Sequence, residues 1–269
     1  IFGSNISLTE ILNYSDDDVK AIIKALLEEY GVTNIKTAKN KIESKVSADF
    51  MKYIEQNYPK EKLLSLLELF SDRKNDAKIK NEVNPSATVP TIYEYLIGIA
   101  WYYLSNKNFD LYASFNMTLN ADFEPEMHAV GGDGDIVINY PKTSIMLEVT
   151  LMNKAAQKKG EREPVLRHSL NNKAKHMEID TLTFFIADEL DYNTINIWRA
   201  VAAVPLRSTN SGGVDINGVI IMPLTLGNII SFIRKNVPMD KIINIVKDSF
   251  SKVPKITESN WYTDIIHNL

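Results

Sequence analysis

The chain has 269 residues, enough for one large domain or two unequal ones, and its hydrophobic share of 45% is typical of globular proteins. It contains no cysteine, which excludes disulfides and zinc sites built on thiolates and fits a reducing cytoplasm. No apolar run approaches the roughly 20 residues that a membrane span needs, so we expect no membrane partner.

The net charge of the chain is −4, from 34 acidic and 30 basic residues. A protein that binds DNA unaided is usually basic, because contacts with phosphates dominate its affinity. The chain also begins at Ile1 rather than at a methionine. If DNA is the substrate, we therefore expect much of the binding to come from a part of a longer protein that this chain does not include.

The first part of the chain is predicted to be helical. Ser15 precedes three aspartates and caps a helix that ends at Gly31, and further apolar stripes follow at helical spacing. Residues 71–86 are charged, with Asn and Pro near their end, and are the best candidate for a linker or domain boundary. We therefore predict a helical connector or dimerisation region at residues 1–85 and a second domain at residues 86–269.

The second part alternates between helix and strand patterns. Pro90 opens a helix, and alternation at residues 112–119 predicts a strand. After a β-hairpin and a polar stretch, the pattern predicts helices at 163–177, 192–203, 226–235 and 239–253 and buried strands at 181–187 and 218–224. Strands that alternate with helices after a hairpin imply an α/β fold with a mixed sheet flanked by helices.

The hairpin carries two acids. Residues 136–139 and 144–151 are rich in β-branched and apolar side chains and are separated by a tight turn. Asp135 opens the first strand, and Glu148 lies inside the second, where a carboxylate is costly unless it is paired or bound to a metal. Two carboxylates on one hairpin suit Mg²⁺ and phosphodiester hydrolysis. The plain alternatives are a turn-capping aspartate and a glutamate on a solvent face.

Four further side chains are candidates for the same site. Glu163 and Arg167 are four residues apart on a predicted helix, and His168 comes next. Together they would supply an acid, a phosphate-binding guanidinium and a proton-transfer imidazole. The alternatives are a surface ion pair between Glu163 and Arg167 and a packing histidine. Glu94, on the helix that Pro90 opens, is a further acid, with a solvated helix edge as its alternative.

These residues resemble a known family. Asp135, Leu147-Glu148-Val149-Thr150 and Glu163-Pro164-Val165-Leu166-Arg167-His168 resemble the catalytic domain of AlwI-type restriction endonucleases, which are type IIS or nicking enzymes of the PD-(D/E)XK nuclease fold. The similarity extends from Tyr93 to about Phe232 and leaves out residues 1–85. It implies that residues 86–269 form a PD-(D/E)XK nuclease domain.

The resemblance also implies roles for the candidate residues. Asp135, Glu148 and Glu94 would hold the metal, and Glu163 and His168 would complete the catalytic site. Arg167 would bind the phosphate.

One position departs from the wider superfamily. Most PD-(D/E)XK enzymes place a lysine two residues after the second acid, where this chain has Thr150. We predict that His168 takes the role of that lysine, with Lys154 and Lys173 as alternatives.

From this resemblance we expect a Mg²⁺-dependent DNA endonuclease of the bacterial cytoplasm, with Mn²⁺ as a substitute metal. Double-stranded DNA is the expected partner, read by a recognition domain or second subunit outside this chain. One such site cuts one strand, so cleavage of both strands would need a dimer, a second subunit or sequential action. Two alternatives stay open: a repair or recombination nuclease that acts on DNA structure, and a non-catalytic DNA-binding or assembly subunit on the same fold.

Overall fold

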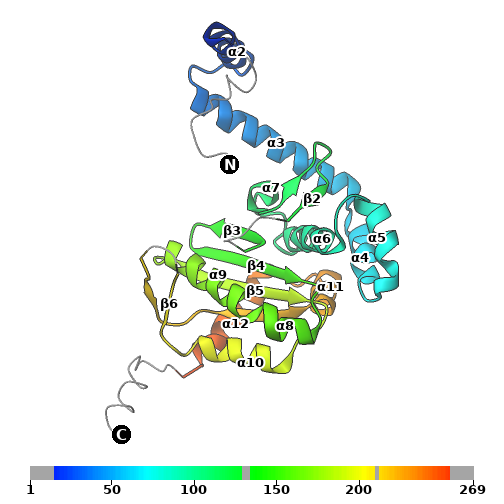
Figure 1. The fold of residues 1–269 in the computed structure, drawn as a ribbon, viewed down its shortest axis with the longest axis vertical. Coiled ribbons are helices and arrows are strands. Elements are labelled where there is room, and N and C mark those ends of the chain that lie inside the picture. The colour runs from blue at the N-terminus through cyan, green and yellow to red at the C-terminus, as the bar shows by residue number, and fades with distance from the viewer. Residues whose placement is uncertain (1–14, 129–133, 210–211, 255–269) are drawn as a thin grey trace. The chain divides into compact units, whose positions relative to one another are not determined.

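The computed structural model describes residues 15–128, 134–209 and 212–254 (Figure 1). The chain forms two compact units, which divide between Lys52 and Tyr53. Among the described helices, none has the length and apolar composition required to cross a membrane.

The first unit contains the helix predicted after Ser15. Helix α2 (Asp16–Glu29) begins with a capping box, in which the Ser15 hydroxyl accepts from the backbone N–H of Asp18 and the Asp18 carboxylate accepts from the backbone N–H of Ser15. The chain then turns at Gly31, whose φ of +57° lies in the left-handed region that favours glycine. Helix α3 (Ile35–Asn57) follows and continues into the second unit.

The second unit includes the stretch that the sequence suggested as a linker. Residues 71–86 contain the short 3₁₀ helix η1 (Arg73–Asn75) and helix α5 (Asp76–Val83), so the linker interpretation is wrong. Helix α5 buries Ile79 and Val83, and it packs, like α4 (Lys60–Leu69), against α6 (Val89–Leu104). Residues 53–85 therefore lie in the same compact unit as the residues that follow them.

A four-stranded mixed sheet forms the centre of the second unit, which confirms the predicted fold class. Its order is β3 (Ile136–Tyr140), β4 (Thr143–Thr150), β5 (Asp180–Ala187) and β8 (Ile221–Thr225). Strands β3 and β4 are antiparallel and form the predicted hairpin, whereas β4, β5 and β8 run parallel. The two central strands are apolar along most of their length because helices cover both of their faces.

Two adjacent phenylalanines of β5 show how the helices cover the sheet. Successive side chains of a strand point to opposite faces. Phe184 packs on Trp101 of α6, with ring centroids 4.7 Å apart, and Phe185 packs on Trp198 of α10 (Tyr192–Val201), with centroids 4.4 Å apart. Helices α6 and α10 therefore lie on opposite faces (Figure 1).

Helix α9 (Arg162–Lys175) shares the α10 face. Its residues Val165 and Leu170 belong to the same buried cluster as Phe185 and Trp198. Helix α11 (Leu226–Arg234) contacts α6 and α4, and α12 (Met239–Ser251) closes the described part of the unit.

Several short elements differ from the sequence expectation. Residues 112–119 were expected as one strand, but Asp110 caps a short helix α7 (Leu111–Ser114) by accepting from Ala113 N–H at 3.0 Å. Thr118–Leu119 (β1) pairs with β2 (Pro125–Met127), and Phe115 forms a single β-bridge with Ile136. The polar stretch after β4 contains helix α8 (Lys154–Gly160), and the strands β6 (Leu206–Arg207) and β7 (Asp215–Ile216) pair before β8.

The last strand begins later than expected. Gly218, predicted to open it, has φ of +83°, and a Cβ atom there would lie 2.4 Å from the carbonyl oxygen of Ala202. Only glycine fits that close approach, so the chain turns at Gly218 and β8 begins at Ile221.

Candidate active site

The hairpin brings its two acids to one end. In the β3–β4 register Ile136 lies opposite Leu147, so Asp135, just before β3, and Glu148, just after Leu147, lie at the same end of the hairpin. Asp135 is fixed there because its Oδ2 accepts a hydrogen bond from the backbone N–H of Val149 at 2.7 Å. Residues 132 and 133, which precede this end in the Gly-Asp-Gly-Asp segment, lie outside the described residues.

Glu148 is buried under helix α9. Its exposed fraction is only 7%, and it lies beside Phe185 in the β4–β5 register, which places it on the α9 face of the sheet. His168 on α9 reaches it, with 2.8 Å between His168 Nδ1 and Glu148 Oε1. The predicted neighbourhood of Glu148 and His168 is therefore present as a direct contact.

Burial and mutual repulsion disfavour negative charge at this end of the hairpin. The pKa of Glu148 is raised well above its usual value by burial, by Glu161 and by Glu94, although Arg167 lowers it. The pKa of Asp135 is raised by burial and by the charges of Glu148 and Glu161, against the hydrogen bond from Val149.

Helix α6 contributes the third predicted acid. The pKa of Glu94 is raised to about 9, because the side chain is largely buried and Asp135 and Glu161 lie nearby. Glu94 therefore belongs to the same electrostatic cluster as the hairpin acids. A helix edge open to solvent, the plain alternative for this residue, would not produce such a shift.

The fourth acid of the cluster is Glu161, which the sequence reasoning did not select. Glu161 ends α8 and immediately precedes α9, and its charge raises the pKa of Glu94, Asp135 and Glu148. It stands seven residues before His168, about two helical turns, so both lie on one side of α9. That spacing is the sequence signal for Glu161.

Glu163, the acid that was predicted for the site, is exposed to solvent. Its side chain is 72% exposed, and its Oε1 accepts from Arg167 Nε at 2.9 Å, four residues along α9. It is not among the groups that shift the pKa of Glu94, Asp135 or Glu148. The structure thus brings Glu94, Asp135, Glu148, His168 and Arg167 together and places Glu163 on the outer side of the helix, in the ion pair that was its plain alternative.

The position expected to hold lysine is neutral. The Thr150 hydroxyl accepts a hydrogen bond from Met152 N–H at 3.1 Å. Lys154 Nζ lies 3.2 Å from Glu189 Oε2, and Lys173 Nζ donates to the Ile179 carbonyl at 2.8 Å. His168, by contrast, contacts Glu148 directly.

The donor set suits a hard cation. In the described part of the chain, no group of three His, Asp or Glu side chains is arranged as a ready-made metal site. Mg²⁺, however, usually takes one or two carboxylates and keeps several waters. The Val149 N–H donates to Oδ2 of Asp135 and His168 contacts Oε1 of Glu148, so within the described residues the second oxygen of each acid is available to a metal. A cation would also relieve the repulsion that raises the pKa of these acids.

Comparison with known proteins places the chain in a family. The solved structure of the small subunit (R.BspD6I2) of the heterodimeric restriction endonuclease R.BspD6I is 21% identical and covers 73% of this chain and 99% of its own, with a TM-score of 0.48. No curated protein matches the chain. The model of the AlwI restriction endonuclease family matches residues 5–232, which include the acid cluster and also most of the N-terminal region that the resemblance left out. The chain therefore belongs to the AlwI restriction endonuclease family.

Proposed function

We propose that this chain is a Mg²⁺-dependent DNA endonuclease of the PD-(D/E)XK type, with Mn²⁺ able to replace Mg²⁺. The observation that carries the proposal is the pair of buried carboxylates, Asp135 and Glu148, at one end of a rigid hairpin. Family membership supports a nuclease that acts on DNA.

The residues of the cluster would have separate roles in hydrolysis. Asp135, Glu148 and Glu94 would hold the metal, which, when bound, lowers the pKa of a water and stabilises charge on the leaving oxygen. His168 orients Glu148 through the 2.8 Å contact and would accept the proton of the attacking water. Arg167, whose charge acts on Glu148, would hold the scissile phosphate.

DNA recognition would come from elsewhere, as in type IIS enzymes. The net charge of −4 gives the chain little general attraction for DNA. A separate recognition domain or a second subunit would therefore bring the duplex to the acid cluster. Because one cluster cuts one strand, cleavage of both strands would need a dimer or a second subunit.

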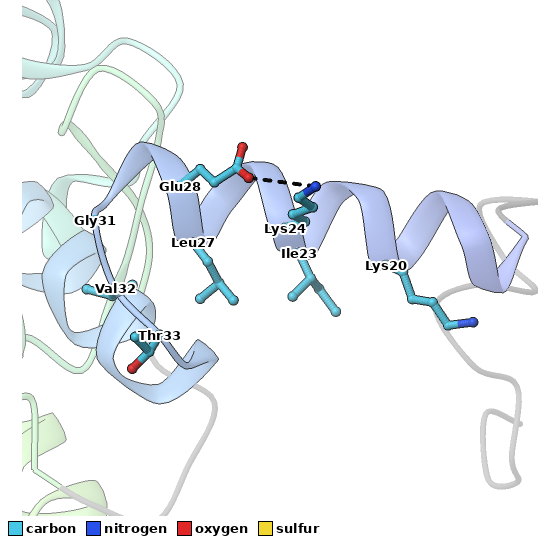
Figure 2. A pocket seen from close by; sticks show the side chains of 8 residues that line it. All are labelled: Lys20, Ile23, Lys24, Leu27, Glu28, Gly31, Val32 and Thr33. Atoms are coloured by element: carbon cyan, nitrogen blue, oxygen red, sulfur yellow. Dashed lines mark ion pairs between the residues drawn. The ribbon is translucent and has the colours of Figure 1, made fainter.

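The first compact unit suits the role of connector or dimerisation region. Ile23 and Leu27 project from one side of α2 toward a pocket that Val32 also lines (Figure 2). The ion pair between Lys24 and Glu28 flanks this side. An apolar side of a surface helix is available for packing against another chain.

The direct test is cleavage of supercoiled plasmid by the full-length protein with Mg²⁺, followed by sequencing of the DNA ends. We expect nicked or linear DNA with breaks at a fixed offset from one short sequence, and no breaks when EDTA removes the metal. Breaks that follow DNA structure instead of sequence would indicate a repair-type nuclease. Intact plasmid with both Mg²⁺ and Mn²⁺ would indicate a non-catalytic subunit.

A matched pair of variants separates the two acids at the start of α9. Glu161→Gln is expected to slow cleavage roughly 10- to 100-fold and to raise the Mg²⁺ concentration required, because Glu161 acts on all three metal-binding acids. Glu163→Gln is expected to stay within about threefold of the wild type, as an exposed ion pair contributes little. Cleavage rates over a Mg²⁺ titration measure both, and equal losses in the two variants would contradict the assignment.

A further inference from the structure

A second cavity lies on the same face of the hairpin as the acids. It has a volume of about 230 Å³ and is bounded by β3, β4, α7 and α9, and Gly134, the residue before Asp135, forms part of its wall. Met146, which lines the cavity, and Glu148 are two residues apart in β4 and therefore share one face of the sheet. The cavity is thus the continuation of the acid cluster along the hairpin.

The polar side chains that line this cavity, unlike those of the acid cluster, include no carboxylate among the described residues. Its polar side chains are Ser114, Asn116, Asn139, Asn172, Lys175 and His176. A cavity with amide donors, a lysine and a histidine, next to a cluster of acids, suits an anionic ligand that presents acceptor oxygens.

Asn172 is the strongest sign of a ligand. The residue is only 6% exposed, and its Oδ1 lies 3.3 Å from the Ser144 hydroxyl, which donates to it. Its Nδ2, although buried, has no hydrogen-bond partner in the described part of the chain. An unsatisfied buried donor costs about 1–3 kcal/mol, so such a group is usually satisfied by a ligand or water.

Helix α9 connects this cavity to the acid cluster. His168, which contacts Glu148, and Asn172, which lines the cavity, are four residues apart and lie on one side of the helix. Their separation along the helix axis is about 6 Å. One extended strand can therefore reach both places at once. Lys175 and His176 follow one turn further on.

We infer that the cavity binds a phosphodiester of the cleaved strand, adjacent to the one held at the acid cluster. Asn172 Nδ2 donates to a phosphate oxygen, Lys175 supplies positive charge and His176 supplies a ring N–H donor. The site fixes the register of the strand, so that only one phosphate meets Asp135 and Glu148. This inference rests on the proposed nuclease function, because it takes the cleaved strand as the ligand.

Three variants of the full-length protein test the inference. Asn172→Asp keeps the shape and the acceptor for Ser144 but replaces the free donor with a negative charge, and Lys175→Gln removes a charge at an exposed position, where folding is not at risk. Asn196→Asp, on the exposed side of α10, is the matched control for the added charge. Binding of a fluorescent duplex is measured by anisotropy with Ca²⁺ in place of Mg²⁺, over a range of salt concentrations, and thermal unfolding confirms that each variant is folded.

We expect Asn172→Asp to weaken duplex binding about tenfold, because a negative charge replaces the donor to the phosphate. Lys175→Gln should reduce the slope of log K against log salt by about 1, the signature of one lost phosphate contact. Asn196→Asp should bind within twofold of the wild type. Inorganic phosphate should displace far less duplex than unlabelled DNA at the same phosphate concentration.

The outcomes separate this inference from the nuclease function. If wild type cleaves DNA and both cavity variants bind and cleave like Asn196→Asp, the phosphate site is wrong and the nuclease function stands. If duplex binding depends on Asn172 and Lys175 but no Mg²⁺-dependent cleavage occurs, the nuclease function fails and the phosphate site stands. Equal competition by inorganic phosphate, or no duplex binding by the wild type, would overturn the phosphodiester site.

Discussion

Replacing Asp135 with Asn, or Glu148 with Gln, is expected to reduce Mg²⁺-dependent DNA cleavage at least about 1,000-fold. Each change removes one negative charge from the pair that would hold the metal, while the amide keeps nearly the same shape. A metal contributes several kcal/mol to transition-state stabilisation, and about 4 kcal/mol corresponds to a factor of 1,000 in rate. Single-turnover cleavage of an end-labelled duplex under enzyme excess measures the chemical step.

The control for this experiment is Glu163→Gln, which makes the same chemical change on the outer side of α9. Circular dichroism of each variant establishes that the helices and sheet are intact. Restoring the rate with higher Mg²⁺ or with Mn²⁺ would show that metal affinity, rather than folding, was lost. Cleavage by folded Asp135→Asn or Glu148→Gln within tenfold of the wild type would remove these two acids from the catalytic role.

The sequence predicted best those elements whose burial follows a simple period. The hairpin, β5 and the capped helix α2 were recognisable from alternation, apolar runs and the Ser15 cap. Helix α5 was not, because only Ile79 and Val83 of its eight residues are buried. Apart from Ala77 the rest of the helix is polar, and a polar surface helix and a linker have similar compositions.

Helix α8 shows a second limit of pattern reasoning. Its buried residue is a glutamine, Gln157, whose amide donates to the carbonyl groups of Met152 and Glu189 at 2.8 and 2.7 Å. Glu189 is 32 residues away in the chain. Tertiary hydrogen bonds hold such a helix in place, and the polar sequence of the helix does not predict them.

The candidate site was likewise predictable from the sequence only in part. The hairpin register predicted that Asp135 and Glu148 meet, because residue pairing across a tight turn follows from the spacing alone. Glu163 was selected for its spacing of four residues from Arg167, which allows an ion pair on either side of a helix. In the structure this pair lies on the exposed side of α9, and the offset of two residues places Glu161 on the opposite side.

The acid cluster should also make the metal-free protein less stable as the pH rises. The folded-state pKa of Glu94 is about 9, against 4.5 for the ordinary group, and those of Asp135 and Glu148 are shifted in the same direction. A carboxyl group whose pKa is higher in the folded state than in the unfolded state stabilises the folded state. This stabilisation is fully present below the unfolded-state pKa and is lost as the pH rises toward the folded-state pKa. One pKa unit corresponds to about 1.4 kcal/mol, so Glu94 alone is worth on the order of 5 kcal/mol.

We therefore expect the free energy of unfolding, measured by urea denaturation in EDTA, to fall by several kcal/mol between pH 5 and pH 9. Glu94→Gln should reduce this fall and should unfold at a higher temperature than the wild type at pH 8, although it cuts DNA more slowly. Mg²⁺ should stabilise the wild type more at pH 8 than at pH 6, because protons compete with the metal for the same oxygens. Glu163→Gln, with its carboxylate in solvent, should behave as wild type. A flat pH profile for the metal-free wild type would mean that the four acids do not share one buried site.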